Sequence, residues 1–185
     1  MGEAALRATE SGKVAASDGW FVVNLADAAG ARTPDLGAFI PLESDEIEFP
    51  QFGINVHLLN PGEPNGMYHS EQAQEAFLVL HGECLLLVEE QERPLRQWDF
   101  FHCPPGVDHI IVGAGAGPCA ILMVGRRGPE FDSVHYPVSA LAARHGASVP
   151  AATDDPKRAY AHVDREETPA LLGWPPQGRP APSPR

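Results

Sequence analysis

The sequence has little of what indicates a secreted or membrane-bound protein. Its three cysteines, Cys84, Cys103 and Cys119, are an odd number and lie apart from one another, so we expect buried free thiols and no disulfide framework. No stretch approaches the roughly 20 apolar residues that span a bilayer. The opening segment MGEAALRATESGKVAASDG lacks the basic and apolar regions of a signal peptide. We therefore expect a cytoplasmic protein.

Positive charge is also scarce. The chain of 185 residues has 13 Lys and Arg against 25 Asp and Glu, a formal net charge of -12. An acidic surface repels nucleic-acid phosphates and anionic lipid headgroups, so neither nucleic acid nor membrane is an expected partner. Hydrophobic residues make up 43% and charged residues 21%, which is typical of one soluble globular domain.

Turn residues and short apolar runs are abundant. The 18 glycines and 19 prolines are typical of many short strands joined by turns. We expect strands over residues 54–60, 76–80, 83–89, 99–103, 109–112 and 120–125. Turn-rich segments and the polar run EEQERP separate them. This spacing, without an internal repeat, favours one all-β sandwich or barrel over alternating β–α units.

The flanking regions differ in composition from the strand-rich centre. The aromatic and β-branched run 20–23 is expected to cover the barrel or to cross to a dimer partner. Residues 137–146 and 154–163 carry short helical patterns, and the proline-rich end has too few apolar residues to join a core. We divide the chain into an N-terminal segment (1–35), a barrel (36–128), a C-terminal helical extension (129–172) and a tail expected to be disordered (173–185).

Potential metal ligands are concentrated in two stretches, GMYHSEQAQEAFLVLHG at 66–82 and WDFFHCPPGVDHIIVG at 98–113. In the first, His69, Glu71 and Glu75 share parity, so an extended backbone places all three on one face. In the second, the PPG sequence predicts a sharp turn that returns His109 on the following strand. A hairpin of this kind can direct His109 toward the same interior.

These two stretches resemble the paired motifs of the cupin superfamily, G-x5-H-x-H-x(3,4)-E-x6-G and G-x5-P-x-G-x2-H-x3-N. His69, Glu75 and His109 match ligand positions, and Glu71 stands in place of the second histidine. Trp98 stands where the leading glycine of the second motif belongs, and Gly113 where its asparagine belongs. The resemblance implies a double-stranded β-helix, or jelly-roll, barrel with short peripheral helices on the C-terminal side.

The resemblance also implies one divalent metal inside the barrel. Carried over by position, the ligands are His69, Glu75 and His109, with Glu71 as a fourth ligand or as a catalytic general base. Imidazole and carboxylate ligands suit Zn, Mn, Fe or Ni. Two imidazoles with one carboxylate would also resemble the facial arrangement of non-haem iron enzymes, which leaves coordination positions open.

Three further side chains have two interpretations each. His102 either points inward as an additional ligand or partner, or lies at the rim. His57 either lines the cavity or lies on an ordinary surface. Cys103 is either a soft thiolate ligand of the metal or a buried small hydrophobe. It has the opposite parity to His102, so only one of them faces the interior, and we expect Cys103 to be buried as a hydrophobe. The apolar interior is expected to include Phe77, Val79, Leu85, Leu87, Phe100 or Phe101, and Ile111.

Three kinds of function fit this sequence, which is similar over residues 52–125 to small single-domain bacterial cupins without an assigned reaction. The first is a metal-dependent oxygenase, isomerase or lyase acting on a small polar metabolite. The second is a binding module that holds a metabolite or a metal without chemistry. A third is a barrel whose motifs no longer bind metal. The first two imply a small molecule in the barrel, and the resemblance implies a homodimer.

Overall fold

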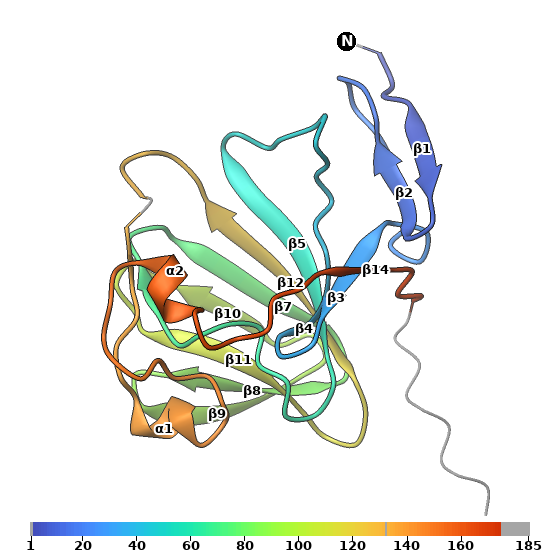
Figure 1. Cartoon of the computed structure of the whole chain (residues 1–185). Coiled ribbons are helices and arrows are strands. Elements are labelled where there is room, and N and C mark those ends of the chain that lie inside the picture. Colours follow the sequence, from blue (N-terminus) through green and yellow to red (C-terminus); the bar gives the residue numbers. More distant parts are fainter. Residues whose placement is uncertain (1, 132, 175–185) are drawn as a thin grey trace, which may run out of the picture.

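Two β-sheets that share one core form the body of the protein (Figure 1). The computed structural model describes residues 2–131 and 133–174. The larger sheet contains β3 (Gly30–Thr33), β4 (Gly37–Ile40), β5 (Phe52–Leu59), β7 (Glu75–His81), β10 (Phe100–Cys103), β12 (Cys119–Arg126) and β14 (Thr168–Ala170). The smaller sheet contains β8 (Glu83–Val88), β9 (Gln91–Arg96) and β11 (His109–Ala114). Their orders are β10-β7-β12-β5-β4-β3-β14 and β11-β8-β9, and the pairings are antiparallel.

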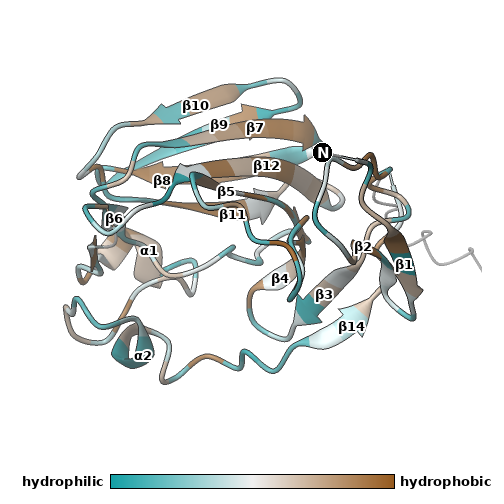
Figure 2. Cartoon of the chain, turned by 90° about the horizontal axis from the view of Figure 1, so that it is seen from above, coloured by the Kyte–Doolittle hydropathy of each residue, from teal (hydrophilic) through white to brown (hydrophobic). Residues whose placement is uncertain are grey.

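Shorter elements surround the two sheets. They are the hairpin of β1 (Leu6–Thr9) and β2 (Gly12–Ala15), the pair β6 (Ser70–Glu71) and β13 (Val134–His135), and the helices α1 (Ala140–Ala143) and α2 (Pro156–Ala159). Figure 2 shows β1 and β2 on one side of the molecule and both helices on the other. The chain is therefore an all-β double-stranded β-helix barrel with short helices at its C-terminal side, as the sequence predicted.

Apolar side chains from both sheets fill the barrel. Cys84, Leu86 and Ile111 of the smaller sheet meet Phe77 and Ile121 of the larger one in a single buried cluster. Burial of such side chains contributes most of the favourable free energy of folding. All three cysteines are free and buried, as expected. In β7 and β12 alternate residues therefore face inward, as the sequence predicted for Phe77 and Val79.

The expectation that Leu85 and Leu87 line the interior is wrong. Leu87 is buried with Leu141 of α1, and Leu85 packs against the same outer cluster. Residues 84–88 are all apolar, so the alternation along β8 cannot identify the inward face; α1 covers one face and the barrel core the other. The alternative between the two phenylalanines is resolved, since Phe101 packs on the core and Phe100 is exposed.

A strand replaces the loop expected at EEQERP. Residues Gln91–Arg96 form β9, which pairs with β8 at the edge of the smaller sheet. Its side chains are almost all exposed, so charged residues are favourable there and discourage pairing with another chain. Pro94 is tolerated because an edge strand does not need every backbone donor. The strand was not predicted because its residues are polar and show no alternation of apolar and polar side chains.

The flanking segments also differ in detail from expectation. The run 20–23 forms no strand, and Trp20 makes only an isolated bridge to Glu3. The helical pattern at 137–146 yields the single turn α1, capped by the Ser139 side chain, which accepts a hydrogen bond from the Ala142 backbone N–H at 3.0 Å. Residues 175–185 of the expected tail lie outside the described residues. The segment boundaries and the homodimer stay predictions.

No helix in the described part of the chain has the length and apolar character that crossing a membrane requires.

Trp98 has an unfavourable backbone conformation. Its φ is 76°, in the left-handed region, and its backbone N–H donates to the Val79 carbonyl at 2.8 Å. A residue with a Cβ pays about 1–2 kcal/mol for this conformation. The indole is 67% exposed, so its burial offsets little of that cost. The position therefore keeps the backbone geometry that suits the glycine of the second cupin motif.

Trp98→Gly is expected to stabilise the protein, raising Tm by about 1–3 °C. The gain is reduced because glycine also increases the entropy of the unfolded chain. Phe100→Gly is the matched control: Phe100 is 64% exposed but lies in β10, so its glycine variant should lower Tm. Thermal unfolding measures the Tm of both variants. A drop in Tm for Trp98→Gly would mean that the backbone conformation of Trp98 does not destabilise the protein.

Candidate metal centre

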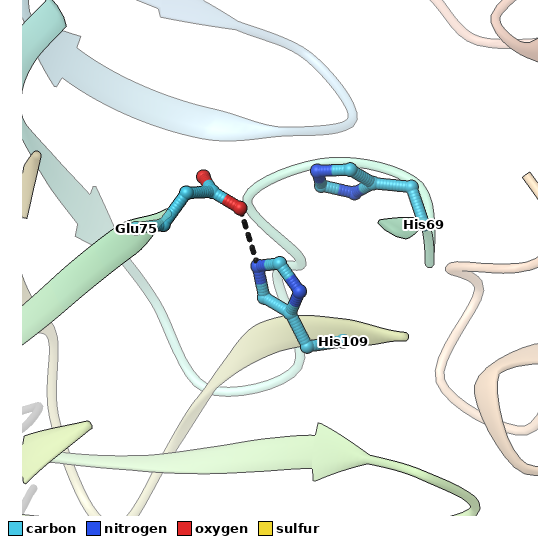
Figure 3. A group of neighbouring side chains, drawn as sticks. All are labelled: His69, Glu75 and His109. Carbon is cyan, nitrogen blue, oxygen red and sulfur yellow. Dashed lines mark ion pairs between the residues drawn. The ribbon is translucent and has the colours of Figure 1, made fainter. Parts of the chain in front are cut away.

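Three of the expected metal ligands lie close together (Figure 3). One ligand atom each from His69, Glu75 and His109 lies within 4.8 Å of the others. Glu75 begins β7, His109 begins β11, and His69 directly precedes β6. The two histidines pair through their backbones: the His109 N–H donates to the His69 carbonyl at 2.8 Å, and the His69 N–H donates to the His109 carbonyl at 3.1 Å. This pairing holds the imidazole centroids 5.0 Å apart.

Backbone carbonyls orient both imidazoles. His69 Nδ1 lies 2.7 Å from the Met67 carbonyl oxygen, and His109 Nδ1 lies 3.0 Å from the Val107 carbonyl oxygen. A carbonyl oxygen only accepts hydrogen bonds, so in each neutral ring Nδ1 carries the hydrogen and Nε2 keeps its lone pair. Histidines that bind metals are commonly held by such a contact through the other ring nitrogen. Both rings therefore present Nε2 as a ligand atom.

Glu75 carries a buried carboxylate oxygen without a hydrogen-bond partner among the described residues. Its Oε2 makes no hydrogen bond to any described residue and lies 3.4 Å from His109 Nε2. Burial, reinforced by the charge of Glu71, raises the pKa of Glu75 to about 7. Burial, together with the proximity of His69, lowers the pKa of His109 to about 4. A divalent cation would stabilise the carboxylate beside neutral imidazoles, so these residues fit a metal.

Glu71 lies beside this group but outside the set of mutually close ligand atoms. Its Oε1 is 3.6 Å from His69 Nε2, and 35% of its side chain is exposed. The hydrogen bond to His69 outweighs burial and lowers the pKa of Glu71. Burial lowers the pKa of His69, but the interactions with Glu71 and Glu75 outweigh it and raise that pKa overall. An ionised Glu71 at this position suits either predicted role, ligand or base.

The structure separates the three ambiguous side chains. His102 is exposed on β10 and does not point into the barrel, whereas Cys103 is buried, with Sγ 3.4 Å from His109 Nδ1. His57 faces the interior, because it pairs with the core residue Ile121. Burial lowers the pKa of His57 to about 4, so it is neutral near pH 7. Of the two interpretations for His57, lining the cavity is the one the structure supports.

Tyrosines of the C-terminal extension also reach the centre, which the sequence did not indicate. The ring centroid of Tyr136 lies 5.7 Å from that of His69, and Tyr160 contacts Tyr136 edge-on at 5.9 Å. The Tyr160 hydroxyl accepts a hydrogen bond from the Met67 N–H at 3.2 Å. A residue distant in sequence and outside the motifs gives no local signal for such contacts.

A cavity of about 440 Å³ adjoins the centre. Its polar lining comes from the larger sheet, from the loop after β5 and from the C-terminal extension, namely Thr33, Asn55, His57, Asn65, Tyr136, Tyr160, Arg165 and Glu167. Tyr136 contacts His69 and also lines the cavity, so this ring separates the cavity from His69. Its volume is in the range of small-molecule sites.

Comparison with known proteins identifies the barrel. Residues 55–125 match the family of cupin domains called Cupin_2. The barrel is a cupin domain. The match lies within the barrel predicted from the paired motifs, and the resemblance to cupins is confirmed. None of the curated proteins matches the chain.

Several solved structures are similar to this chain at low sequence identity. A cupin-superfamily sugar phosphate isomerase from Silicibacter pomeroyi is 22% identical over 62% of this chain and 85% of its own, with a TM-score of 0.52. A proposed sugar phosphate isomerase from Acidithiobacillus ferrooxidans is 28% identical over 46% of this chain, with a TM-score of 0.42, and this chain spans 54% of its length. A cupin 2 domain-containing protein from Halorhodospira halophila is 20% identical over 65% and 89% of the two chains, with a TM-score of 0.48. The likeness to the Silicibacter pomeroyi structure supports the fold and leaves the reaction open.

Proposed function

We propose that this cupin domain binds one divalent transition metal through His69, Glu75 and His109 and catalyses a reaction of a small polar molecule beside it. The observation that carries the proposal is the convergence of three ligand atoms within 4.8 Å. Structural zinc sites use four protein ligands, whereas catalytic sites keep a position open. A set of two histidines and one glutamate therefore supports catalysis over simple metal storage.

The surrounding residues would control access and protonation. A divalent metal would polarise an oxygen of the bound molecule or lower the pKa of a bound water. Phe77 and Phe101 contact His109 edge-on, with centroids 5.2 and 5.9 Å away, and limit water on that side. Glu71 Oε1, near His69 Nε2, would accept a proton from the substrate and return it. Proton transfer of this kind favours an isomerase or lyase, while an oxygenase would instead consume dioxygen.

Metal titration tests the proposal. Untagged protein, stripped with chelator and dialysed, is titrated with Zn²⁺, Mn²⁺, Fe²⁺ and Ni²⁺ in separate experiments. We expect binding to saturate near one ion per chain for at least one of them. Saturation well below one ion for all four would overturn the proposed metal centre and would favour a barrel that works without metal.

Glu71→Gln is expected to keep metal binding while removing catalysis. Glutamine retains the size of the side chain but cannot take up a proton at neutral pH, and loss of a general base typically lowers kcat by about 10²–10⁴. Elemental analysis and metal titration should give a Kd within about tenfold of the wild-type value. Glu48→Gln, at an exposed loop position, is the control. Loss of metal together with activity would instead make Glu71 a fourth ligand.

A further inference from the structure

Two polar side chains of β5 face the barrel interior with an atom left without a partner. Asn55 and His57 pair with Met123 and Ile121 of β12, both members of the interior core cluster. Since alternate residues of a strand share a face, Asn55 and His57 lie on the same side. Asn55 Oδ1 and His57 Nδ1 are buried and have no hydrogen-bond partner within the described ranges. Both residues line the 440 Å³ cavity.

Unpartnered polar atoms of this kind destabilise a fold. Water or a ligand must supply the missing hydrogen bonds, or the atoms keep the full cost of desolvation. Asn65, in the same cavity, shows the contrast: its Oδ1 accepts from the Ile111 N–H at 2.9 Å, and its Nδ2 donates to Met123 Sδ at 3.4 Å. Asn65 therefore supports the fold, whereas Asn55 and His57 leave hydrogen-bonding capacity directed at the cavity.

The chemistry of the two atoms restricts what can bind them. An amide oxygen only accepts hydrogen bonds, so the group opposite Asn55 Oδ1 must be a donor. A carboxylate or the dianion of a phosphate monoester has no donor to offer. The imidazole of His57 is neutral near pH 7 because burial lowers its pKa to about 4, so it provides no charge to attract an anion. A hydroxyl group both donates and accepts, and it satisfies either atom.

The remaining walls favour a ligand with an apolar face. Leu36, Phe39 and Tyr136 also line the cavity, and the Phe39 ring is stacked against His57 with centroids 5.9 Å apart. Arg165 and Glu167 line it too; their opposite charges add no net charge, and the Arg165 guanidinium lies over the Tyr160 ring, 4.6 Å from its centroid. Positions i and i+2 of a strand lie about 7 Å apart. A ring or short chain that carries two hydroxyl groups can span that distance while its carbon skeleton packs on these side chains.

We propose that Asn55 and His57 bind the hydroxyl groups of a small uncharged polyol or phenol, whose opposite end lies toward Tyr136 and His69. The position of the reacting end rests on the proposed function, whereas the hydroxyl contacts do not require a metal. The inference gives a ligand class for the cavity: a neutral, hydroxylated molecule rather than an organic anion, because Asn55 Oδ1 needs a donor and the charge of Arg165 is opposed by that of Glu167.

Thermal unfolding separates a binding site from a structural polar pair. Asn55→Leu and His57→Leu each remove an unsatisfied buried atom and should raise Tm by about 2–4 °C. Asn65→Leu removes the partner of the Ile111 N–H and should lower Tm, which makes it the matched control. A fall in Tm for Asn55→Leu similar to that for Asn65→Leu would overturn the proposal, because it would mean that Asn55 is satisfied within the fold.

Binding of a defined probe series provides the second test. trans-1,4-Cyclohexanediol, cyclohexanol and cyclohexanecarboxylate share one ring and differ in their polar groups. We expect the diol to bind best and to shift the NMR signals of the Asn55 side-chain amide and the His57 ring. Asn55→Leu should raise the Kd of the diol at least tenfold. Unchanged diol binding in Asn55→Leu, or stronger shifts of these two signals by the carboxylate, would contradict the inference.

The same titrations in metal-free and Zn²⁺-loaded protein keep the two proposals distinct. Zn²⁺ affinity should be unchanged in Asn55→Leu, since Asn55 is not among the three ligands. A wild-type protein that binds the diol at Asn55 but no metal would support this inference and overturn the metal centre. A protein that binds one Zn²⁺ per chain but shows no diol-dependent shift at Asn55 or His57 would overturn this inference alone.

Discussion

His109→Ala is expected to abolish stoichiometric metal binding. The side chain is 2% exposed, its Nδ1 is held by the Val107 carbonyl, and its Nε2 lies 3.4 Å from Glu75 Oε2. Removing it leaves one histidine and one carboxylate, too few for a firm site. Mutating a residue that only orients a metal ligand typically weakens metal affinity by about 10–100-fold. We expect the Kd for Zn²⁺ to rise by more than this, because His109 is itself a proposed ligand. Titration with Zn²⁺, followed by elemental analysis after dialysis, measures the effect.

The control must separate loss of a ligand from loss of the fold. His102→Ala removes an exposed histidine on β10 and should leave the metal content near one ion per chain. His69→Ala should reproduce the effect of His109→Ala at a less buried position. Circular dichroism checks that the strands persist in all three proteins. Full metal occupancy in a folded His109→Ala protein would mean that this histidine is not a ligand.

Gly113→Asn is expected to destabilise the protein severely, even though it restores the asparagine of the second cupin motif. A Cβ at this position would overlap Asn60 O and lie 2.8 Å from Asn60 C and 3.0 Å from Leu59 Cβ. The backbone cannot yield, because the Gly113 N–H donates to the Glu63 carbonyl and the Gly62 N–H donates to the Gly113 carbonyl. Overpacking against fixed backbone typically costs about 1–3 kcal/mol and occasionally more.

Gly117→Asn provides the comparison for that experiment. A Cβ added at Gly117 meets no atom within 4 Å, so this variant should keep wild-type stability within about 0.5 kcal/mol. Denaturant unfolding of both variants should place the midpoint of Gly113→Asn far lower, or its soluble yield should collapse. Equal stabilities would show that the loop around Asn60 can move aside. The departure from the motif at Gly113 would then need another explanation.

The central strands were predictable because their residues alternate or form apolar runs bounded by turns. The expected strand at 76–80 became β7 (Glu75–His81), and the one at 120–125 became β12 (Cys119–Arg126). β9 was missed since an exposed edge strand has no buried face to impose a pattern. β4 (Gly37–Ile40) was missed because it begins with Gly and Ala, which are depleted in strands.

The candidate site was predictable only where ligand residues fall inside motifs. His69, Glu75 and His109 were chosen by spacing and resemblance, and their ligand atoms lie close together. Their role as metal ligands stays a prediction until an ion is measured. The sequence treated His57 as ambiguous and gave no signal for Asn55, because the pattern Asn55, His57, Leu59 fits either face of a strand.

The sequence by itself determined an all-β cupin barrel and the residues that could bind a metal, since both depend on local alternation, turn residues and motif spacing. Only the tertiary structure decided which face of β8 points inward, that Tyr136 reaches His69, and that Asn55 and His57 border a cavity. These contacts join strands and loops far apart in the chain. These contacts depend on how the whole barrel packs, so they cannot be predicted from any short stretch of sequence.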